Sequence, residues 1–230
     1  PASGAETAYD PPDGDSVAWC WKAGDTTVTN NEGSRESQVT ANTAAGFSIV
    51  TYTGLSASNA TVGHGLNSAP EFMIIKQMDD TRNFAVYNIG SGNTNIIFLN
   101  LPNPTDAAAE YWQNTDPTDE VFSIGTSTFV NADGDYVAYC WAPIPGYSAF
   151  GSYTGNNNAD GPFIYTGMRS AFVMIKRTDT NGDWYVWDTT RDINNPCFQH
   201  LIPDSTNPEN TNSGTANQID ILSNGFKLLS

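Results

Sequence analysis

The stretch Phe72-Met73-Ile74-Ile75-Lys76 returns 100 residues later as Phe172-Val173-Met174-Ile175-Lys176. Two further stretches keep this offset: Asn83–Asn88 matches Asp183–Asp188, and Val121–Gly125 matches Ile221–Gly225. A sequence that repeats at a fixed period predicts a repeated structural unit. The chain is therefore expected to contain two related units of about 100 residues each.

Strand patterns dominate both units. Phe47–Thr53 alternates side chains with a period of two and is rich in β-branched and aromatic residues, which are frequent in strands. Asp133-Gly134 and Asn181-Gly182 favour tight turns between strands. Asp106–Trp112 is the one helical candidate, and we expect a single turn there. The sequence therefore predicts an all-β fold with two tandem units, each resembling a β-sandwich or jelly roll of about seven or eight strands.

The predicted organisation has three parts. Residues 1–45 contain an N-terminal strand at 16–22, followed by a polar linker or by a hairpin within 26–40. The first sandwich unit covers residues 46–145 and the second covers residues 146–230. The second unit is the shorter of the two, because it ends before any counterpart of the last strand of the first unit.

The strand that the second unit lacks is present at the other end of the chain. Ser16-Val17-Ala18-Trp19-Cys20-Trp21 matches Tyr136-Val137-Ala138-Tyr139-Cys140-Trp141, which closes the first unit. It could complete the second unit of its own chain or that of a neighbouring copy, or the chain is a cut from a longer array. If the strand completes a neighbouring copy, Val17, Trp19 and Trp21 belong to an assembly strand, and the protein forms a homo-oligomer or filament.

The composition argues against several classes of partner. Nine Lys and Arg residues against 25 Asp and Glu residues give a formal net charge of −16. Such a surface repels nucleic-acid phosphates and anionic membranes, so we expect neither nucleic-acid binding nor membrane insertion. Charged residues make up only 15% of the chain, and Thr, Asn, Ser and Gly supply most of the polar surface. This composition is typical of extracellular or virion-exposed β proteins.

The sequence contains no recognisable catalytic motif. His64 and His200 have no repeat partner and lie outside every known nucleophile motif, so we expect structural or surface roles for both. Cys20 and Cys140 are flanked by aromatic residues in matching strands, which predicts small buried side chains rather than a disulfide or a zinc site. We therefore predict no catalytic residue and a protein that is not an enzyme.

Aromatic residues suggest one ligand site. Exposed rings beside Asn, Gln and Asp can stack on a sugar ring while the polar neighbours bond to its hydroxyls. Tyr111, Trp112, Trp184 and Trp187 are the candidates for contact with a host surface glycan. The alternative for the two strand tryptophans is that they fill the sandwich cores.

Acidic turns suggest a second ligand site. Asp133 and Asp135 lie in one short loop rich in oxygen ligands, and Asp179 and Asp183 lie in another. Both loops could bind calcium, although neither completes the EF-hand pattern and hairpin turns explain them equally well. No other cofactor is predicted.

The chain resembles a known group of sequences at several short motifs. These are Ala18–Gly24, Asn42–Gly54, Val62–Leu66, Ala69–Lys76, Gly151–Gly155, Asp160–Phe163 and Phe172–Arg177. They are similar to repeat segments of uncharacterised structural and tail-fibre-like proteins of marine bacteriophages, cyanophages especially. The resemblance covers most of residues 16–230. It implies a virion component and names no catalytic residue.

These patterns lead to one functional expectation with two alternatives. We expect a non-enzymatic structural or adhesive component of a phage virion or a similar extracellular assembly. It would assemble through β-edges and interfaces with itself or with other virion proteins, and host-glycan binding could accompany this role. The alternative is a lectin-like carbohydrate-binding module, and a glycoside-active enzyme comes third. The expected location is the virion surface or the extracellular space.

Overall fold

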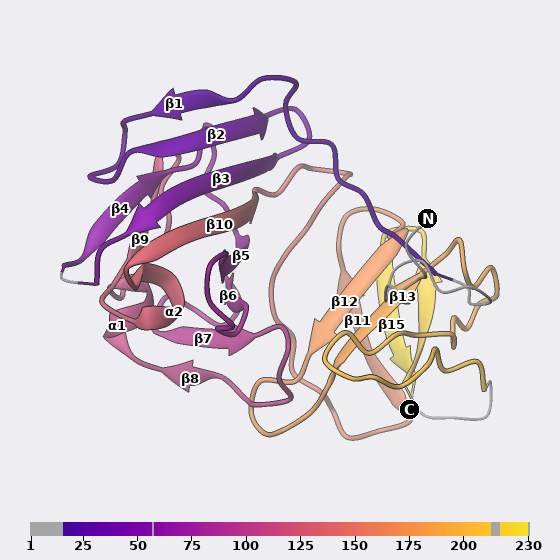
Figure 1. The fold of residues 1–230 in the computed structure, drawn as a ribbon. Helices are drawn as coiled ribbons and strands as arrows, with labels where there is room; N and C mark the ends of the chain where they lie inside the picture. The colour runs from indigo at the N-terminus through magenta and orange to yellow at the C-terminus, as the bar shows by residue number, and fades with distance from the viewer. Residues whose placement is uncertain (1–15, 57, 213–216, 230) are drawn as a thin grey trace, which may run out of the picture.

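The structure is a computed structural model that describes residues 16–56, 58–212 and 217–229. Strands dominate it, and every ladder between named strands is antiparallel, so the prediction of an all-β fold is confirmed. Figure 1 shows two regions side by side. The larger region contains β1 to β10 and the smaller region contains β11 to β15.

The larger region is built on an eight-stranded sheet. In spatial order its strands are β1 (Val28–Asn30), β2 (Ser37–Asn42), β3 (Phe47–Gly54), β10 (Gly134–Trp141), β5 (Phe72–Gln77), β6 (Ala85–Asn88), β7 (Asn95–Phe98) and β8 (Asp106–Ala107). The last of these in chain order, β10, lies inside the sheet and pairs with β3 on one side and with β5 on the other. Completion of this sheet therefore depends on a strand that is distant in sequence from both of its neighbours.

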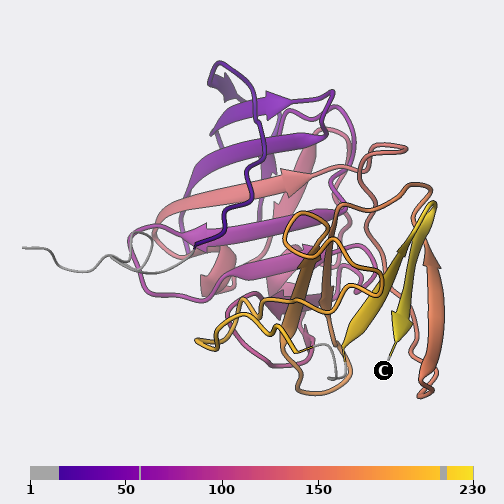
Figure 2. The same cartoon turned by 90° about the vertical axis from the view of Figure 1, so that its right-hand side faces the viewer.

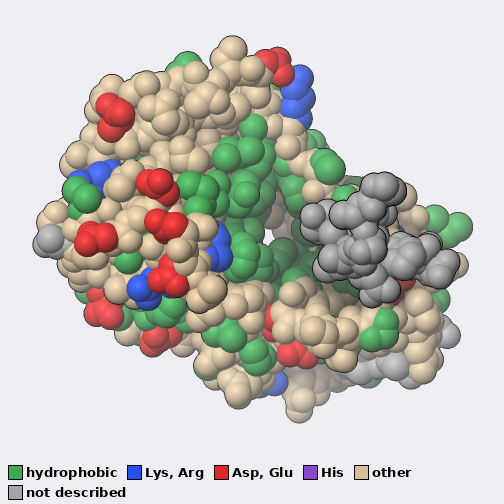
Figure 3. Space-filling view, in the orientation of Figure 1, with side chains coloured by type: hydrophobic (Ala, Val, Ile, Leu, Met, Phe, Trp, Pro, Cys, Tyr) green, Lys and Arg blue, Asp and Glu red, His purple; other side chains and the backbone are tan. Residues whose placement is uncertain are grey.

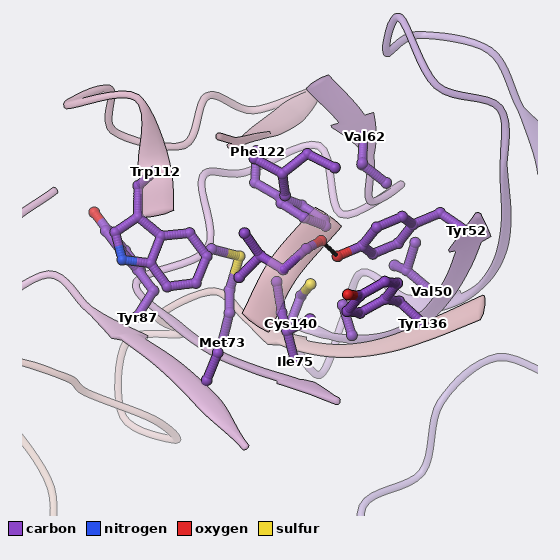
Figure 4. Packing of buried hydrophobic residues seen from close by; sticks show 14 of the residues in the cluster. Val50, Tyr52, Val62, Met73, Ile75, Tyr87, Trp112, Phe122, Tyr136 and Cys140 are labelled. Carbon is purple, nitrogen blue, oxygen red and sulfur yellow. Dashed lines mark hydrogen bonds between the residues drawn. The ribbon is translucent and has the colours of Figure 1, made fainter. Parts of the chain in front are cut away.

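A second layer covers one face of this sheet and makes the region sandwich-like. It contains β4 (Ala60–Gly63), which pairs with β9 (Val121–Ile124), and the single helical turns α1 (Ala109–Trp112) and α2 (Thr128–Asn131). No helix of the described residues is long and apolar enough to cross a membrane. Large side chains from both layers form the main core (Figure 4), which includes Val50, Tyr52, Val62, Met73, Ile75, Tyr87, Trp112, Phe122, Tyr136 and Cys140.

The alternation of side chains along β10 explains which of its faces is buried. Tyr136, Ala138 and Cys140 point into the core and are fully buried, whereas the residues between them are only partly covered. The ring of Tyr136 stacks on Tyr52 at a centroid distance of 5.2 Å. The Tyr52 hydroxyl donates to the Val130 carbonyl at 2.7 Å, so this buried phenol has its hydrogen-bond partner (Figure 4).

The smaller region has two short sheets around its own core. One is the pair β12 (Phe172–Lys176) and β13 (Trp184–Asp188), and the other is ordered β11 (Asp160–Tyr165), β15 (Gly225–Leu229) and β14 (Gln218–Leu222). Figure 2 shows the three-stranded sheet at the margin of the molecule, away from the eight-stranded sheet. The core between the two short sheets contains Val173, Trp187, Cys197, Ile219, Ile221 and Phe226.

The two regions meet through a separate apolar cluster. Trp184 of β13 packs with Val86 and Ile97 of the larger region, and its indole Nε1 donates to the Phe98 carbonyl at 2.9 Å. Backbone bonds add to the contact, with the Gly182 N–H donating to the Pro102 carbonyl at 2.9 Å. A buried indole with a satisfied N–H holds the two regions together.

Several predicted elements agree with the structure, but one boundary does not. The hairpin within residues 26–40 is present as β1 and β2, and the helical segment is the single turn α1 after the short strand β8. The proposed boundary after residue 45 is wrong, because β2 pairs along β3 and the hairpin extends the eight-stranded sheet. The larger region therefore begins before residue 46.

The repeat is visible in one hairpin and fails elsewhere. In β5–β6 residue Phe72 pairs with Asn88, and in β12–β13 Phe172 pairs with Asp188, so the two hairpins share a register. The predicted match between 121–125 and 221–225 is wrong, because β14 ends at Leu222 and β15 begins at Gly225, with the hairpin turn inside the predicted repeat. Residues 147–154 form no strand, although their counterparts are those of β3.

Candidate functional site: the N-terminal segment and the edge of β12

The N-terminal segment, residues 16–22, lies against the smaller region of its own chain. The rings of Trp19 and Trp21 each approach the Phe172 ring at a centroid distance of 5.7 Å, in edge-to-face geometry. Trp21 also approaches Trp141, the last residue of β10, at 5.8 Å. The segment therefore bridges the end of the eight-stranded sheet and the first residue of β12.

An ion cluster holds the indole of Trp19. Its Nε1 donates to the Asp188 carboxylate at 3.2 Å, and the guanidinium of Arg191 lies 5.6 Å from its ring centroid. Asp188 also accepts from the Nε of Arg191, whose other side pairs with Glu209. Burial alone would raise the pKa of Asp188, but hydrogen bonds from the Arg191 backbone and side chain outweigh it, and the pKa is lowered. Sequence inspection missed this cluster, because Arg191 and Glu209 carry no motif.

The segment contacts β12 through side chains without forming a strand. Residues 16–22 form no ladder, and within the described part of the chain their one backbone hydrogen bond runs from the Asn42 side chain to the Lys22 carbonyl at 3.2 Å. Ala18 and Cys20 are exposed, whereas Ala138 and Cys140, their counterparts in β10, are fully buried. The prediction that Cys20 is buried is therefore wrong, because no sheet encloses this segment.

The edge of β12 that faces away from β13 has no strand partner among the described residues. The matching strand β5 is paired on both sides, by β6 and by β10. An unpaired edge presents backbone donors and acceptors that another strand can take up. Figure 3 shows hydrophobic side chains gathered in the hollow between the two regions. Val17 and Trp21, which the sequence places in a candidate assembly strand, are 41% and 42% exposed, which leaves both side chains free for further burial.

The four aromatic residues proposed as a glycan platform are core side chains. Tyr111, Trp112, Trp184 and Trp187 are all at most 4% exposed, so the prediction that they stack on a sugar is wrong. Trp112 donates to the Asn95 carbonyl at 2.8 Å, and Trp187 to the Asn217 carbonyl at 3.2 Å. Their polar atoms have partners inside the fold, which is typical of structural aromatics.

The acidic loops form no multi-carboxylate group. Asp135 accepts from the Thr53 hydroxyl at 2.8 Å, and both carboxylate oxygens of Asp179 accept from Arg177, at 2.7 and 3.1 Å. Asp133 directly precedes β10, of which Asp135 is the second residue, and Asp183 directly precedes β13. Across residues 16–56, 58–212 and 217–229, no three His, Cys, Asp or Glu side chains gather closely enough to hold a metal. Calcium binding stays a prediction from the loop sequences.

The two histidines are buried and hydrogen bonded. The Nε2 of His64 lies 3.1 Å from the Thr118 carbonyl, and its Nδ1 accepts from the Leu66 N–H at 3.2 Å. In His200 the Nδ1 lies 3.0 Å from the Phe198 carbonyl. Burial lowers the pKa of both imidazoles, which favours their neutral forms. These contacts are those of structural histidines.

Two shallow hollows lie on the surface, and neither adds a reactive centre. One of about 280 Å³ is lined by the loop Gly155–Ala159 with Leu228, and one of about 240 Å³ by residues of β2 and β3 with Met78. Both are smaller than the roughly 300 Å³ at which small-molecule pockets usually begin. The N-terminal segment and the edge of β12 therefore remain the strongest candidate site.

Comparison with known proteins gives one match. The model of a family described as a domain of unknown function (DUF7483) matches residues 3–230. The chain matches none of the curated proteins and none of the solved structures.

Proposed function

From the premise that the chain belongs to the DUF7483 family, we propose that it is a non-enzymatic structural component of a virion or a similar extracellular assembly. It associates with further copies through open sheet edges. The N-terminal segment of one copy pairs with the edge of β12 in the next. The motif resemblance to phage tail-fibre-like proteins supports the virion setting, and the two regions support the mode of association.

One observation carries the proposal: among the described residues β12 has β13 as its single strand partner, while residues 16–21, whose sequence matches β10 at four of six positions, lie outside every sheet. In the larger region the pair Trp141–Phe72 has a centroid distance of 5.4 Å, and Trp21–Phe172 has nearly the same. The aromatic contact that would set the register is present within one chain, and assembly would replace it with the same contact between two copies. Backbone pairing would add hydrogen bonds along β12 and bury the exposed residues of the segment.

The test compares two substitutions at one position. Ala18→Pro removes a backbone N–H and the extended pairing that a central strand needs, whereas Ala18→Ser keeps both. Light scattering after size-exclusion chromatography should give concentration-dependent oligomers for the wild type and for Ala18→Ser, and monomers for Ala18→Pro. A wild type that stays monomeric at high concentration would contradict assembly through this strand.

A thiol assay then identifies which chain supplies the strand. Cys140 and Cys197 are buried, and burial raises the pKa of each thiol to about 12, so Cys20 is the thiol open to reagent. In the proposed assembly Cys20 takes the position of Cys140 and becomes protected only at concentrations that give oligomers. Protection of Cys20 in the isolated monomer would show closure within one chain and refute donation between copies.

A further inference from the structure

The outer face of the three-stranded sheet carries two exposed aromatic rings. Phe163 and Tyr165 are 46% and 71% exposed and lie two residues apart on β11, so they share one face. Ile164 between them packs into the core with Phe226. The two rings therefore project from the face of the sheet that is turned away from the core.

The sheet is shaped to seat these rings. Gly225 of β15 pairs with Tyr165, and a Cβ added at Gly225 would lie 2.9 Å from the Cζ of Phe163. The edge of the Phe163 ring thus rests over bare backbone.

Charged groups border the rings on the same face. Lys227 pairs across from Phe163 on β15 and forms an ion pair with Asp160 at the start of β11. Asp220 of β14 lies directly across from Lys227 on its other side. One positively charged donor and two negatively charged acceptors therefore lie beside the apolar surface that the two rings form.

We propose that Phe163 and Tyr165 form a stacking platform for a neutral glycan. A pyranose ring presents C–H groups on its faces and hydroxyls at its rim, which matches apolar rings bordered by Lys227, Asp160 and Asp220. The two carboxylates and a net charge of −16 disfavour polyanionic glycans. This site is separate from the edge of β12 and does not depend on the proposed assembly.

The size of the platform favours a glycan over a second copy of the chain. The exposed parts of the two rings amount to roughly 250 Å² of surface. A stable interface between proteins buries about 800 Å² on each partner, most of which these rings cannot supply. Two rings separated by one strand residue lie about 7 Å apart, a spacing suited to adjacent sugar units.

The test is native affinity electrophoresis of the full chain in gels containing hydroxyethyl cellulose, galactomannan or laminarin, with alginate as the polyanion. At least one neutral polysaccharide should retard the wild type more than alginate does. Tyr165→Ala should weaken that retardation about tenfold, and Phe163→Ala should also weaken it. Tyr165→Phe keeps the ring and should bind within about threefold of the wild type.

Tyr147→Ala is the matched control, since Tyr147 is 60% exposed outside the platform and should not affect binding. Thermal melts confirm that each variant is folded, which is expected because the substituted rings are exposed. Absence of retardation in all three neutral gels, or full binding by Tyr165→Ala, would overturn the proposal. Loss of self-association in Tyr165→Ala would also overturn it, because the rings would then form an interface between copies.

Discussion

The two regions start from the same hairpin and reach different sheets. In β5–β6 and β12–β13 the residues pair in one register, yet β5 gains β10 as a second partner and β12 gains none among the described residues. Beyond β10 the larger region continues into β3, whereas residues 147–154 form no strand. One central strand therefore decides whether the next segment can pair, since that segment has no other edge to bond to.

The ends of the two hairpins also differ in charge. Asn88 accepts a hydrogen bond from the backbone N–H of Gly90 at 2.7 Å, a local turn contact. Asp188 makes the matching contact with the Thr190 N–H at 3.0 Å, and it binds the Arg191 side chain and the indole of Trp19 in addition. Where the larger region has the amide of Asn88, the smaller region has the carboxylate of Asp188. This carboxylate belongs to a cluster that holds the N-terminal segment, which is distant in sequence.

The largest effect should come from placing a charge on the central strand. Ala138→Asp puts a carboxylate at a fully buried position of β10 and should cost about 4 kcal/mol or more of unfolding free energy. The matched change Ala18→Asp lies at an exposed position and should cost less than about 0.5 kcal/mol. Urea denaturation followed by tryptophan fluorescence measures both. A similar loss in the two variants would mean that residues 16–21 are already inside a sheet.

A second test separates the two regions. Trp184→Ala removes the buried indole between them and its bond to the Phe98 carbonyl, and should cost about 3 kcal/mol. Because the regions would then unfold more independently, calorimetry should resolve two transitions where the wild type gives one. Tyr165→Ala, at an exposed ring on the outer face of the three-stranded sheet, is the control and should keep a single transition. One unchanged transition in Trp184→Ala would show that the regions are coupled by other contacts.

A third test exchanges the hairpin ends. Asp188→Asn leaves an amide facing the Arg191 and Trp19 donors, and should cost about 2 kcal/mol. Release of Trp19 should also speed the reaction of Cys20 with a thiol reagent. The reciprocal Asn88→Asp should change stability by less than about 1 kcal/mol and leave Cys20 reactivity unchanged. If Cys20 reacted with the reagent at the same rate in the wild type and in Asp188→Asn, the ion cluster would not be needed to hold residues 16–22 in place.

The smallest effect for any single residue is a pH dependence to which one histidine in each region contributes. Burial lowers the pKa of His64 in the larger region and of His200 in the smaller one. Above about pH 6.5 both histidines are neutral in the folded and unfolded states, so their contribution to the free energy of unfolding does not change with pH. As the pH falls below 6.5 the unfolded chain takes up protons first, and stability falls by at most about 1.4 kcal/mol per pH unit for each histidine.

Urea denaturation at pH 7.5 and pH 5.5 measures this slope. His64→Gln should reduce it by about half while His200 maintains the remainder. A slope in His64→Gln equal to that of the wild type would show that His64 does not contribute.

Local patterns predicted some strands of the larger region but not β4 or β8, and β8 lies in the segment expected to be helical. Phe47–Thr53 was predicted from its alternation, and β3 covers Phe47–Gly54. The hairpin in 26–40 was one of two alternatives, the other being a polar linker. The helical turn α2 was missed, because Thr128–Asn131 contains β-branched and aromatic residues and is held by the Ser127 cap and core packing instead of helix propensity.

The candidate site was only partly predictable. The match between 16–21 and 136–141 marked residues 16–21 as the proposed assembly strand, but the position of β10 between β3 and β5 depends on long-range pairing that no local pattern encodes. The burial of Trp184 and Trp187 on opposite faces of β13 required the other region and the second sheet as neighbours. Phe163 and Tyr165 could have been noticed from their alternation with Ile164, although Gly161-Pro162 before them weakened the strand signal.

The position of β10 within its sheet also limits when the sheet can be completed during synthesis of the chain. β3 and β5 leave the ribosome long before residues 134–141, so the slot between them stays vacant until β10 is made. Residues 16–21 have emerged earlier, and Ala18 and Cys20 match the small core-facing side chains of the absent strand. Tyr136, whose counterpart in residues 16–21 is Ser16, distinguishes the native strand through its ring stacked on Tyr52.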